Sequence, residues 1–263
     1  MGKPVLQQFD DQIRRNCRFP DCQVDRLECV TRVTGNSTHQ LDNLIVWSDL
    51  DAETADGEIN TQTEYFKRIG HNFEWLVYGH DTPQDLVSRL LARGLERESE
   101  EQVVIAEAGA IAEHLVPTEV DLLCLNDPKQ VPDAVAVQDA VWGNSQHDIL
   151  TRWLTAMVGK RADESIVLVA YADGRPIASA WASLWADRSF APLFGGSVFP
   201  EWRGRGIYRA MVSARATAAS SRGIRWCLVD AGADSAPILK RLGFQVLTSR
   251  TGLRWTTSPN NSG

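Results

Sequence analysis

The sequence has no apolar run long enough to cross a membrane, no paired cysteine motif and no excess of basic residues. Without a run of about 18 apolar residues, a transmembrane helix is excluded, and the first residues lack the apolar core of a secretory signal peptide. The five cysteines show no C-x-x-C spacing, so we expect reduced thiols and no metal site. We therefore expect a soluble, cytoplasmic protein.

The charge balance is acidic, with 34 Asp and Glu against 27 Lys and Arg and a formal net charge of −7. This balance argues against nucleic acid as a partner, because such binding relies on a basic surface. It weakly favours a cationic amine as substrate. A chain of 263 residues, 43% of them hydrophobic, can form one large domain or two modest ones.

The central feature is the stretch of residues 195–221, GGSVFPEWRGRGIYRAMVSARATAASS. Residues 192–199 are mostly apolar and small, which predicts a buried strand with a bulge at its two glycines. The tetrapeptide Arg203-Gly204-Arg205-Gly206 is too rich in glycine for an ordinary helix. A helix is then predicted from apolar residues at a spacing of 3.6, namely Ile207, Ala210, Met211, Ala214 and Ala218.

This order of strand, glycine turn and helix predicts a site for a polyanion such as a pyrophosphate. A helix N-terminus carries unpaired N–H groups and the positive end of the helix dipole, and glycines let the backbone approach a ligand. Arg203 and Arg205 add positive charge. On the tetrapeptide alone, a plain turn with solvated arginines fits equally well. The flanking strand and amphipathic helix favour the site.

Two common phosphate loops do not match the sequence. A Walker loop has Lys and then Ser or Thr after its last glycine, where this chain has Ile207 and Tyr208. A dinucleotide fingerprint needs a third glycine at the position of Arg209. The segment instead resembles the acyl-coenzyme A loop of the GNAT superfamily of N-acetyltransferases, Gln/Arg-x-x-Gly-x-Gly/Ala after a strand ending in Val-x-Pro. Val198-Phe199-Pro200 and the loop fit, although Tyr208 replaces the usual Gly or Ala.

The residues after the loop extend the resemblance to residues 117–256. A buried strand is predicted at 224–230, a short helix at 235–242 ended by a glycine, and two short strands at 244–247 and 253–255. The family has the same order, with a Leu-Gly-Phe before the last strands. The resemblance implies transfer of an acetyl group from acetyl-coenzyme A to a primary amine, by direct attack in a ternary complex.

The resemblance also implies roles for individual residues. The cofactor-binding residues are Val198, Phe199, Arg203, Gly204, Arg205, Gly206, Ile207 and Tyr208. Many family members have a tyrosine as general acid where this chain has Leu239. Asp230 is a candidate base or amine-orienting group, and capping of the next turn fits it equally well. Ser235 is a candidate to contact the pantetheine or to protonate the departing thiolate, and capping a helix is its stronger interpretation. Tyr208 either reaches the cleft or packs in the core, and ordered water can replace a dedicated base.

An N-terminal region repeats this order of elements, with Arg93-Gly94-Leu95 in the place of Leu242-Gly243-Phe244. We therefore expect an α/β (α+β) fold of two tandem GNAT-like halves, each a mixed, mostly antiparallel sheet flanked by helices. The halves span residues 1–116 and 117–257, and a disordered tail follows at 258–263. The N-terminal junction at 48–58 has five carboxylates and no arginine, so we expect no coenzyme A there. A coincidence of common elements is the alternative.

Two other functions stay open. A non-catalytic protein that binds or senses acyl-coenzyme A is favoured by Leu239, which cannot donate a proton. A regulatory protein with a relict loop is the other alternative. For the enzyme, the acceptor is a small-molecule or peptide amine, and we expect no nucleic-acid or membrane partner.

Overall fold

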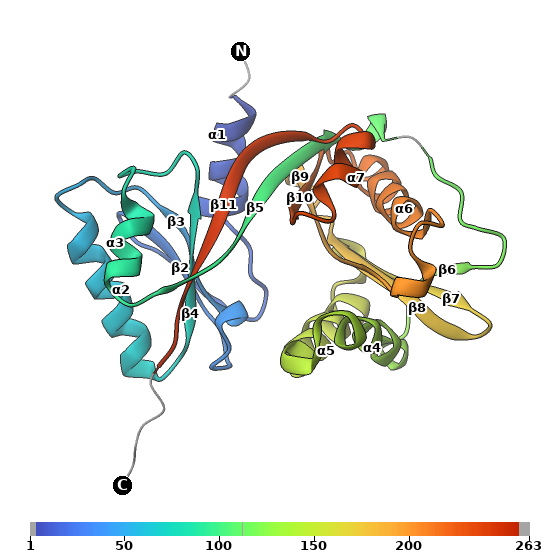
Figure 1. Ribbon diagram of the computed structural model, residues 1–263, viewed down its shortest axis with the longest axis horizontal. Helices are drawn as coiled ribbons and strands as arrows, with labels where there is room; N and C mark the ends of the chain where they lie inside the picture. Colours follow the sequence, from blue (N-terminus) through green and yellow to red (C-terminus); the bar gives the residue numbers. More distant parts are fainter. Residues whose placement is uncertain (1–3, 112, 258–263) are drawn as a thin grey trace, which may run out of the picture. The chain divides into compact units, whose positions relative to one another are not determined.

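The computed structural model describes residues 4–111 and 113–257 (Figure 1). They divide into two compact units. The N-terminal unit comprises the chain up to Val103, Asp230–Ala233 and the residues from Val246 onward, and the C-terminal unit comprises Val104–Val229 and Asp234–Gln245. The tail expected at 258–263 lies outside the described residues. The boundary expected between 116 and 117 stays a prediction.

The N-terminal unit is a mixed sheet with helices, in the strand order β1-β2-β3-β4-β11-β5. Strands β3 and β4 are parallel, whereas the pairs β1–β2, β2–β3 and β4–β11 are antiparallel. Its elements are α1 (Val5–Phe9), the π-helical turn η1 (Asp10–Arg15), β1 (Gln23–Arg26), β2 (Val30–Thr34), η2 (Gln40–Asp42), β3 (Asn43–Ser48), α2 (Ala55–Ile69), β4 (Phe73–Tyr78), α3 (Leu86–Ala92), β5 (Glu96–Glu107), which continues into the other unit, and β11 (Gln245–Trp255).

Helix α2 shows why this unit folds as it does. Its first turn is acidic, its last turn is basic, and Gly70 ends it with a left-handed φ of 71°. Ile59 and Phe66 are fully buried on one side of the helix. Phe66 stacks on Phe73 of β4 with ring centroids 4.5 Å apart, so the helix covers the sheet through an apolar stripe.

Strand β11 corrects one expectation. The two short strands predicted at 244–247 and 253–255 are a single strand, Gln245–Trp255. It pairs with β4 from Arg250 opposite Tyr78 to Trp255 opposite Phe73. The polar residues in its middle looked like a break, but hydrogen bonds to a partner strand keep such a segment extended.

The C-terminal unit has the strand order β10-β9-β8-β7-β6. Strands β9 and β10 are parallel, and the other pairs are antiparallel. The hairpin of β7 and β8 turns at Asp173 and Gly174, which both have positive φ. The elements are η3 (Ala108–Ala110), β6 (Asp121–Cys124), η4 (Pro128–Gln130), α4 (Val131–Trp142), η5 (Asn144–Gln146), α5 (His147–Val158), η6 (Ala162–Glu164), β7 (Ser165–Ala172), β8 (Arg175–Ser183), β9 (Phe190–Val198), η7 (Pro200–Trp202), α6 (Ile207–Ser221), β10 (Trp226–Ala231) and α7 (Ala236–Arg241).

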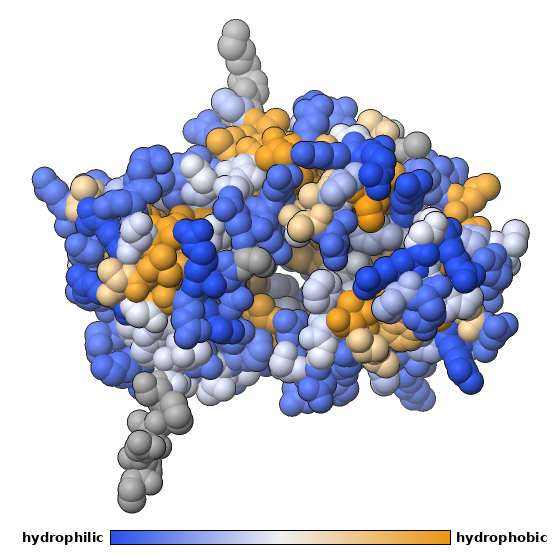
Figure 2. All heavy atoms as spheres, viewed as in Figure 1, coloured by the Kyte–Doolittle hydropathy of each residue, from blue (hydrophilic) through white to orange (hydrophobic). Residues whose placement is uncertain are grey.

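The order β3-α2-β4-α3-β5 is followed later by β9-α6-β10-α7-β11, with a parallel pair at the start of each series. The expected fold class, two tandem α/β halves, is confirmed. On the face drawn in Figure 2, hydrophobic residues form separate patches among hydrophilic ones. No helix in the described part of the chain is long and apolar enough to cross a bilayer.

Candidate functional site

Strand β9 leads into the predicted loop and leaves its parallel neighbour early. Residues Phe190–Pro192 pair with Trp226–Leu228 of β10, and the described residues pair no further, although β9 continues to Val198. The rest of β9 therefore has an open edge on that side, where backbone groups are available to a ligand.

The predicted bulge at Gly195 and Gly196 is confirmed, because the register of β9 against β8 shifts there. Gly195 has a φ of +60°, and a Cβ at this position would collide with the Trp181 ring. A Cβ on Gly196 would lie 2.7 Å from Cε2 of Tyr208. Large rings on either side of the strand thus leave room only for glycine.

The chain between β9 and α6 folds back on the strand. Pro200–Trp202 form one 3₁₀ turn, η7. The Nε of Arg203 donates to the carbonyl oxygen of Val198 at 3.1 Å. This bond fixes the start of the loop, because it ties the end of the turn to the end of the strand.

The loop presents a row of backbone N–H groups. Gly204 and Gly206 have φ angles of +77° and +89°, and α6 starts immediately afterwards at Ile207. Within the described chain, none of the N–H groups of residues 204–209 donates a hydrogen bond. Left-handed residues beside right-handed ones turn successive N–H groups toward one point and form an anion-binding nest. We call residues 204–209 the nest.

Arg205 places positive charge beside the nest. Its guanidinium lies 4.5 Å from the Trp202 ring, donates to the carbonyl oxygen of Glu201 at 3.4 Å and lies 3.7 Å from the carboxylate of Glu119. These contacts are long, and the side chain is about half exposed. Arg205 can therefore turn toward a bound anion at little cost.

Four of the predicted cofactor residues contribute side chains to the core. Val198 and Ile207 are buried, and Phe199 and Tyr208 pack against the same cluster. Their backbones, rather than their side chains, are therefore what the site can offer. Burial raises the pKa of Tyr208, although Arg215 opposes this, so the phenol is protonated at neutral pH.

Asp230 at the end of β10 groups with the N-terminal unit. Its carboxylate accepts a hydrogen bond from Arg250 at 2.5 Å, so its partner is Arg250 rather than the turn that follows. Arg250 also lies 3.3 Å from Glu101 and 3.5 Å from Glu74. Burial raises the pKa of both glutamates, against the pull of Arg250.

Ser235 and Leu239 lie on the short helix α7 of the C-terminal unit. Ser235 occupies the residue before the helix, but its side chain makes no capping bond, contrary to the stronger interpretation. Leu239 is fully buried in the core. The position where the family often has an acid is therefore filled by an apolar side chain.

The corresponding junction of the N-terminal unit, between β3 and α2, already contains an anion. Asp51 Oδ1 accepts the N–H of Glu53 at 2.9 Å, the N–H of Thr54 at 2.7 Å and the Thr54 hydroxyl at 2.7 Å. The bonds from Thr54 and Glu53 lower the pKa of Asp51. A carboxylate of the chain itself thus occupies the place that a phosphate would need.

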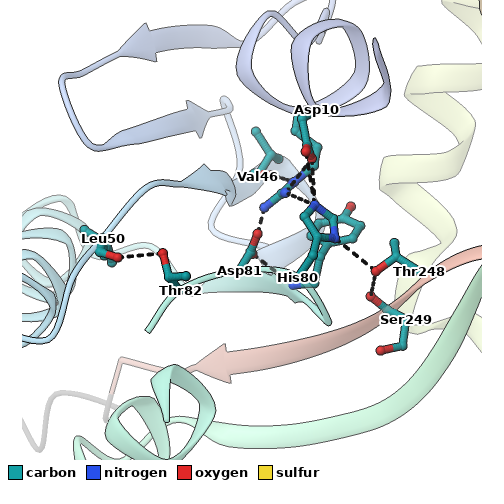
Figure 3. A network of polar contacts seen from close by, with 10 residues as sticks. Asp10, Val46, Leu50, His80, Asp81, Thr82, Thr248 and Ser249 are labelled. Carbon is teal, nitrogen blue, oxygen red and sulfur yellow. Dashed lines mark hydrogen bonds and ion pairs between the residues drawn. The ribbon is translucent and has the colours of Figure 1, made fainter. Parts of the chain in front are cut away.

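The N-terminal unit also contains a buried ion pair (Figure 3). Arg14 of η1 donates to Asp81 at 2.7 Å, and both side chains are almost completely buried. It also donates to Asp10 at 2.7 Å and to the carbonyl oxygen of Val46 in β3 at 3.2 Å. These bonds clamp the N-terminal helical segment to the sheet.

His80 extends this cluster toward the last strand (Figure 3). Its Nε2 lies 3.0 Å from Asp10 and its Nδ1 lies 3.0 Å from the hydroxyl oxygen of Thr248 in β11. Burial opposes the ionisation of Asp10, but hydrogen bonds from His80 and Arg14 lower its pKa. The cluster therefore connects three segments of the unit through hydrogen bonds.

Two buried polar residues beside the bulge, Gln138 on α4 and Arg215 on α6, were not predicted from the sequence. Each is a polar residue among the apolar residues of a helix, and this pattern was the available sign of a structural role. A polar side chain is buried only where it has hydrogen-bond partners. Among the described residues, no group of three or more His, Cys, Asp or Glu is placed to hold a metal ion.

Residues 132–244 match the model of the Acetyltransferase (GNAT) family. Among solved structures, a GCN5-related N-acetyltransferase from Kribbella flavida aligns with a TM-score of 0.71 at 14% identity, covering 92% of both chains. A functionally unknown conserved protein from Staphylococcus epidermidis ATCC 12228 aligns at 0.69 and 14% identity over 94% of this chain and 96% of that one.

A tandem GNAT protein from the clavulanic acid biosynthesis pathway aligns at a TM-score of 0.61 and 12% identity, over 93% of this chain and 86% of that one. No curated protein matches the sequence. The structural likenesses concern the fold, whereas the family match covers the bulge, the nest and α6. The chain thus carries a GNAT acetyltransferase domain at residues 132–244, on the fold of a tandem GNAT protein.

Proposed function

We propose that the C-terminal unit transfers an acetyl group from acetyl-coenzyme A to a primary amine, by direct attack of the amine on the thioester in a ternary complex. The observation that supports this most is the nest, whose N–H groups at residues 204–209 have no partner in the described chain. They follow a bulged strand inside a GNAT domain. Unpaired amides at a helix N-terminus suit a pyrophosphate.

The residues present fit this co-substrate in two places. The nest and the guanidinium of Arg205 would hold the pyrophosphate, and the loop start at Val198 and Phe199 is fixed by Arg203. The open edge of β9 near the bulge would give an N–H group to the thioester carbonyl, on which negative charge develops. In other enzymes, removal of one such donor lowers kcat about 100- to 1,000-fold.

The reaction also needs a group that receives the amine proton and a group that donates a proton to the thiolate. We propose Asp230 as the group that orients or deprotonates the amine, and Ser235 as a donor to the departing thiolate. Asp230 is held by Arg250, so its carboxylate has a fixed direction. Leu239 supplies no proton. Deprotonation through ordered water is the alternative, and Asp230→Asn and Ser235→Ala separate the two by their effect on the pH dependence of kcat.

The second candidate function is a non-catalytic protein that binds or senses acyl-coenzyme A. The buried Leu239 in place of an acid favours it. The two functions share the nest and differ only in turnover.

The acceptor we propose is a small-molecule or peptide amine, and the compartment is the cytoplasm. All five cysteines belong to the described chain and are free thiols.

The deciding experiment measures release of coenzyme A thiol from acetyl-coenzyme A across a panel of amines, including polyamines, aminoglycosides, amino acids and peptide N-termini. The enzyme is supported by amine-dependent thiol release that disappears in Gly206→Asp. The control is Gly223→Asp, at the other end of α6, where φ is also positive and the space equally open. Binding of acetyl-coenzyme A without thiol release for any amine supports the sensor.

A further inference from the structure

We propose that Gln138 and Arg215 are positioning residues that hold the β9 bulge from opposite faces of the sheet and so fix the direction of the one N–H group that polarises the thioester carbonyl. This inference rests on the proposed acetyl transfer. It concerns two helices, α4 and α6, that lie on the two sides of β8 and β9 in Figure 1.

Gln138 holds the bulge from the α4 side. Its Nε2 donates to the carbonyl oxygen of Gly195 at 2.8 Å and to the Ser179 hydroxyl at 2.7 Å. Its Oε1 accepts from the Ser197 hydroxyl at 3.1 Å, and Ser197 in turn accepts from the indole of Trp142 at 2.8 Å. The amide thus bonds to residues before and after Gly196, so it fixes both ends of the bulge.

Arg215 holds the same point from the α6 side. Its NH1 donates to the carbonyl oxygen of Phe194 at 3.1 Å and to that of Trp181, the paired residue on β8, at 3.2 Å. Its Nε donates to the carbonyl oxygen of Met211 at 3.0 Å. The side chain is 2% exposed and has no carboxylate partner in the described chain.

The two faces are distinguished by the alternation of β8 and β9. Ala178, Ala180 and Val198 lie in the core cluster with Ile207 and Met211 of α6. Ser179 and Ser197 alternate with them, so their side chains point to the opposite face, where Gln138 lies. The bulge is therefore gripped between two helices.

Peptide geometry converts these carbonyl contacts into N–H directions. In a planar trans peptide, the C=O of one residue and the N–H of the next point in opposite directions. Arg215 at the Phe194 oxygen therefore sets the N–H of Gly195, and Gln138 at the Gly195 oxygen sets the N–H of Gly196. Without these contacts, two adjacent glycines are the most flexible part of the strand.

Arg215 also brings charge. Burial lowers the pKa of its guanidinium to about 10, which leaves it charged at neutral pH. An unpaired buried cation is costly, and here it lies beneath the carbonyls that flank the bulge. Its positive charge would stabilise negative charge that develops on a thioester oxygen at the bulge.

The test uses the infrared carbonyl stretch of acetyl-coenzyme A labelled with carbon-13 at the thioester carbonyl, bound at saturation, together with kcat, KM and thermal unfolding. In the wild type we expect the stretch at lower frequency than in water, because the carbonyl is polarised. In Gln138→Met and Arg215→Met we expect at least half of that shift to be lost. We also expect kcat to fall about 10- to 1,000-fold, with the Kd of acetyl-coenzyme A, set by the nest, within threefold.

The matched control is Gln62→Met on α2, which also removes a fully buried glutamine that is hydrogen-bonded to Arg32 and Glu58. It should lower thermal stability and leave the carbonyl shift and kcat unchanged. Arg215→Lys keeps the cation and covers the case in which Arg215→Met fails to fold, and it should retain part of the shift.

Three outcomes overturn the proposal. An unchanged carbonyl shift in both Met variants removes the positioning role, whatever happens to stability. A rise in the Kd of acetyl-coenzyme A in both Met variants, with unchanged kcat, assigns the two residues to binding alone. No binding of acetyl-coenzyme A by the wild type removes the proposed function itself, and the inference with it. A normal shift without turnover in the wild type rejects only the enzyme and keeps the positioning.

Discussion

The two strand-to-helix junctions of this chain, β3 to α2 and β9 to α6, have the same place in their units and opposite electrostatics. In front of α2, Asp51 accepts the N–H groups of Glu53 and Thr54. In front of α6, the N–H groups of residues 204–209 donate to nothing in the described chain. One half thus binds its own carboxylate at the backbone N–H groups just before its helix, whereas the other half leaves the N–H groups around its helix start open.

The difference arises from a few residues. Gly204 and Gly206 reach positive φ at no steric cost, and the two arginines of the loop contribute no side-chain acceptor to its amides. The N-terminal junction instead has short acidic residues, which cap their own backbone. A functional nest therefore needs both flexible backbone and the absence of a local acceptor.

The largest expected effect concerns stability of the N-terminal unit. Arg14→Met leaves Asp81 buried without its partner, which should lower the free energy of unfolding by about 3–5 kcal/mol. If this unit has only a supporting role, the Kd of acetyl-coenzyme A at low temperature should stay unchanged. Chemical denaturation and calorimetry on the same preparation check both statements. A large loss of affinity for acetyl-coenzyme A in folded protein would show that the N-terminal unit also contributes to binding.

The next effect concerns the nest. Gly206→Asp places a carboxylate where the pyrophosphate should bind, as Asp51 does in the other half. This substitution should raise the Kd of acetyl-coenzyme A on the order of 100-fold or more. Gly223→Asp, with φ of +74° at the far end of α6, should have little effect on affinity. Equal losses in both variants would mean that strain, rather than charge, is responsible.

A smaller effect is expected at Arg205. Its side chain is about half exposed and only loosely held. Arg205→Ala should raise the Kd of acetyl-coenzyme A about two- to fivefold at low salt. The rise should be smaller at high salt, because exposed charges are screened. Titrations at two ionic strengths measure this. A salt-independent loss would contradict a purely electrostatic role.

The smallest effect is expected at Asp51. Its hydrogen bonds lower its pKa below the ordinary value of 3.8, so its stabilising effect is present above that value and disappears as the pH falls through the lowered pKa. Asp51→Asn should slightly lower the melting temperature at pH 7 and have less effect near pH 3. A difference that grows toward low pH would reverse the expected sign.

The nest could be predicted because its determinants are adjacent in the chain. The glycines, the arginines and the apolar spacing of α6 all lie within residues 195–221. The bulge followed from Gly195 and Gly196 for the same reason. Local sequence suffices where local geometry makes the site.

The rest depends on contacts distant in sequence. Gln138 meets Gly195 across 57 positions, and nothing near Gln138 in the sequence indicates that partner. Arg250 donates a hydrogen bond to the carboxylate of Asp230, 20 positions away in the sequence. Strand β11 pairs with β4, which is also distant in the sequence. Hydrophobic periodicity predicts which residues are buried, but not which strand or side chain lies opposite.

The most direct test of the contrast between the junctions is the stoichiometry of acetyl-coenzyme A binding to the full chain, measured by isothermal titration calorimetry in the wild type and in Gly206→Asp. The account predicts one molecule per chain in the wild type and none in the variant at the same concentration. Two molecules per chain, or one that survives the substitution, would show that the N-terminal junction also binds. No binding to the wild type would show that the open nest holds no coenzyme A.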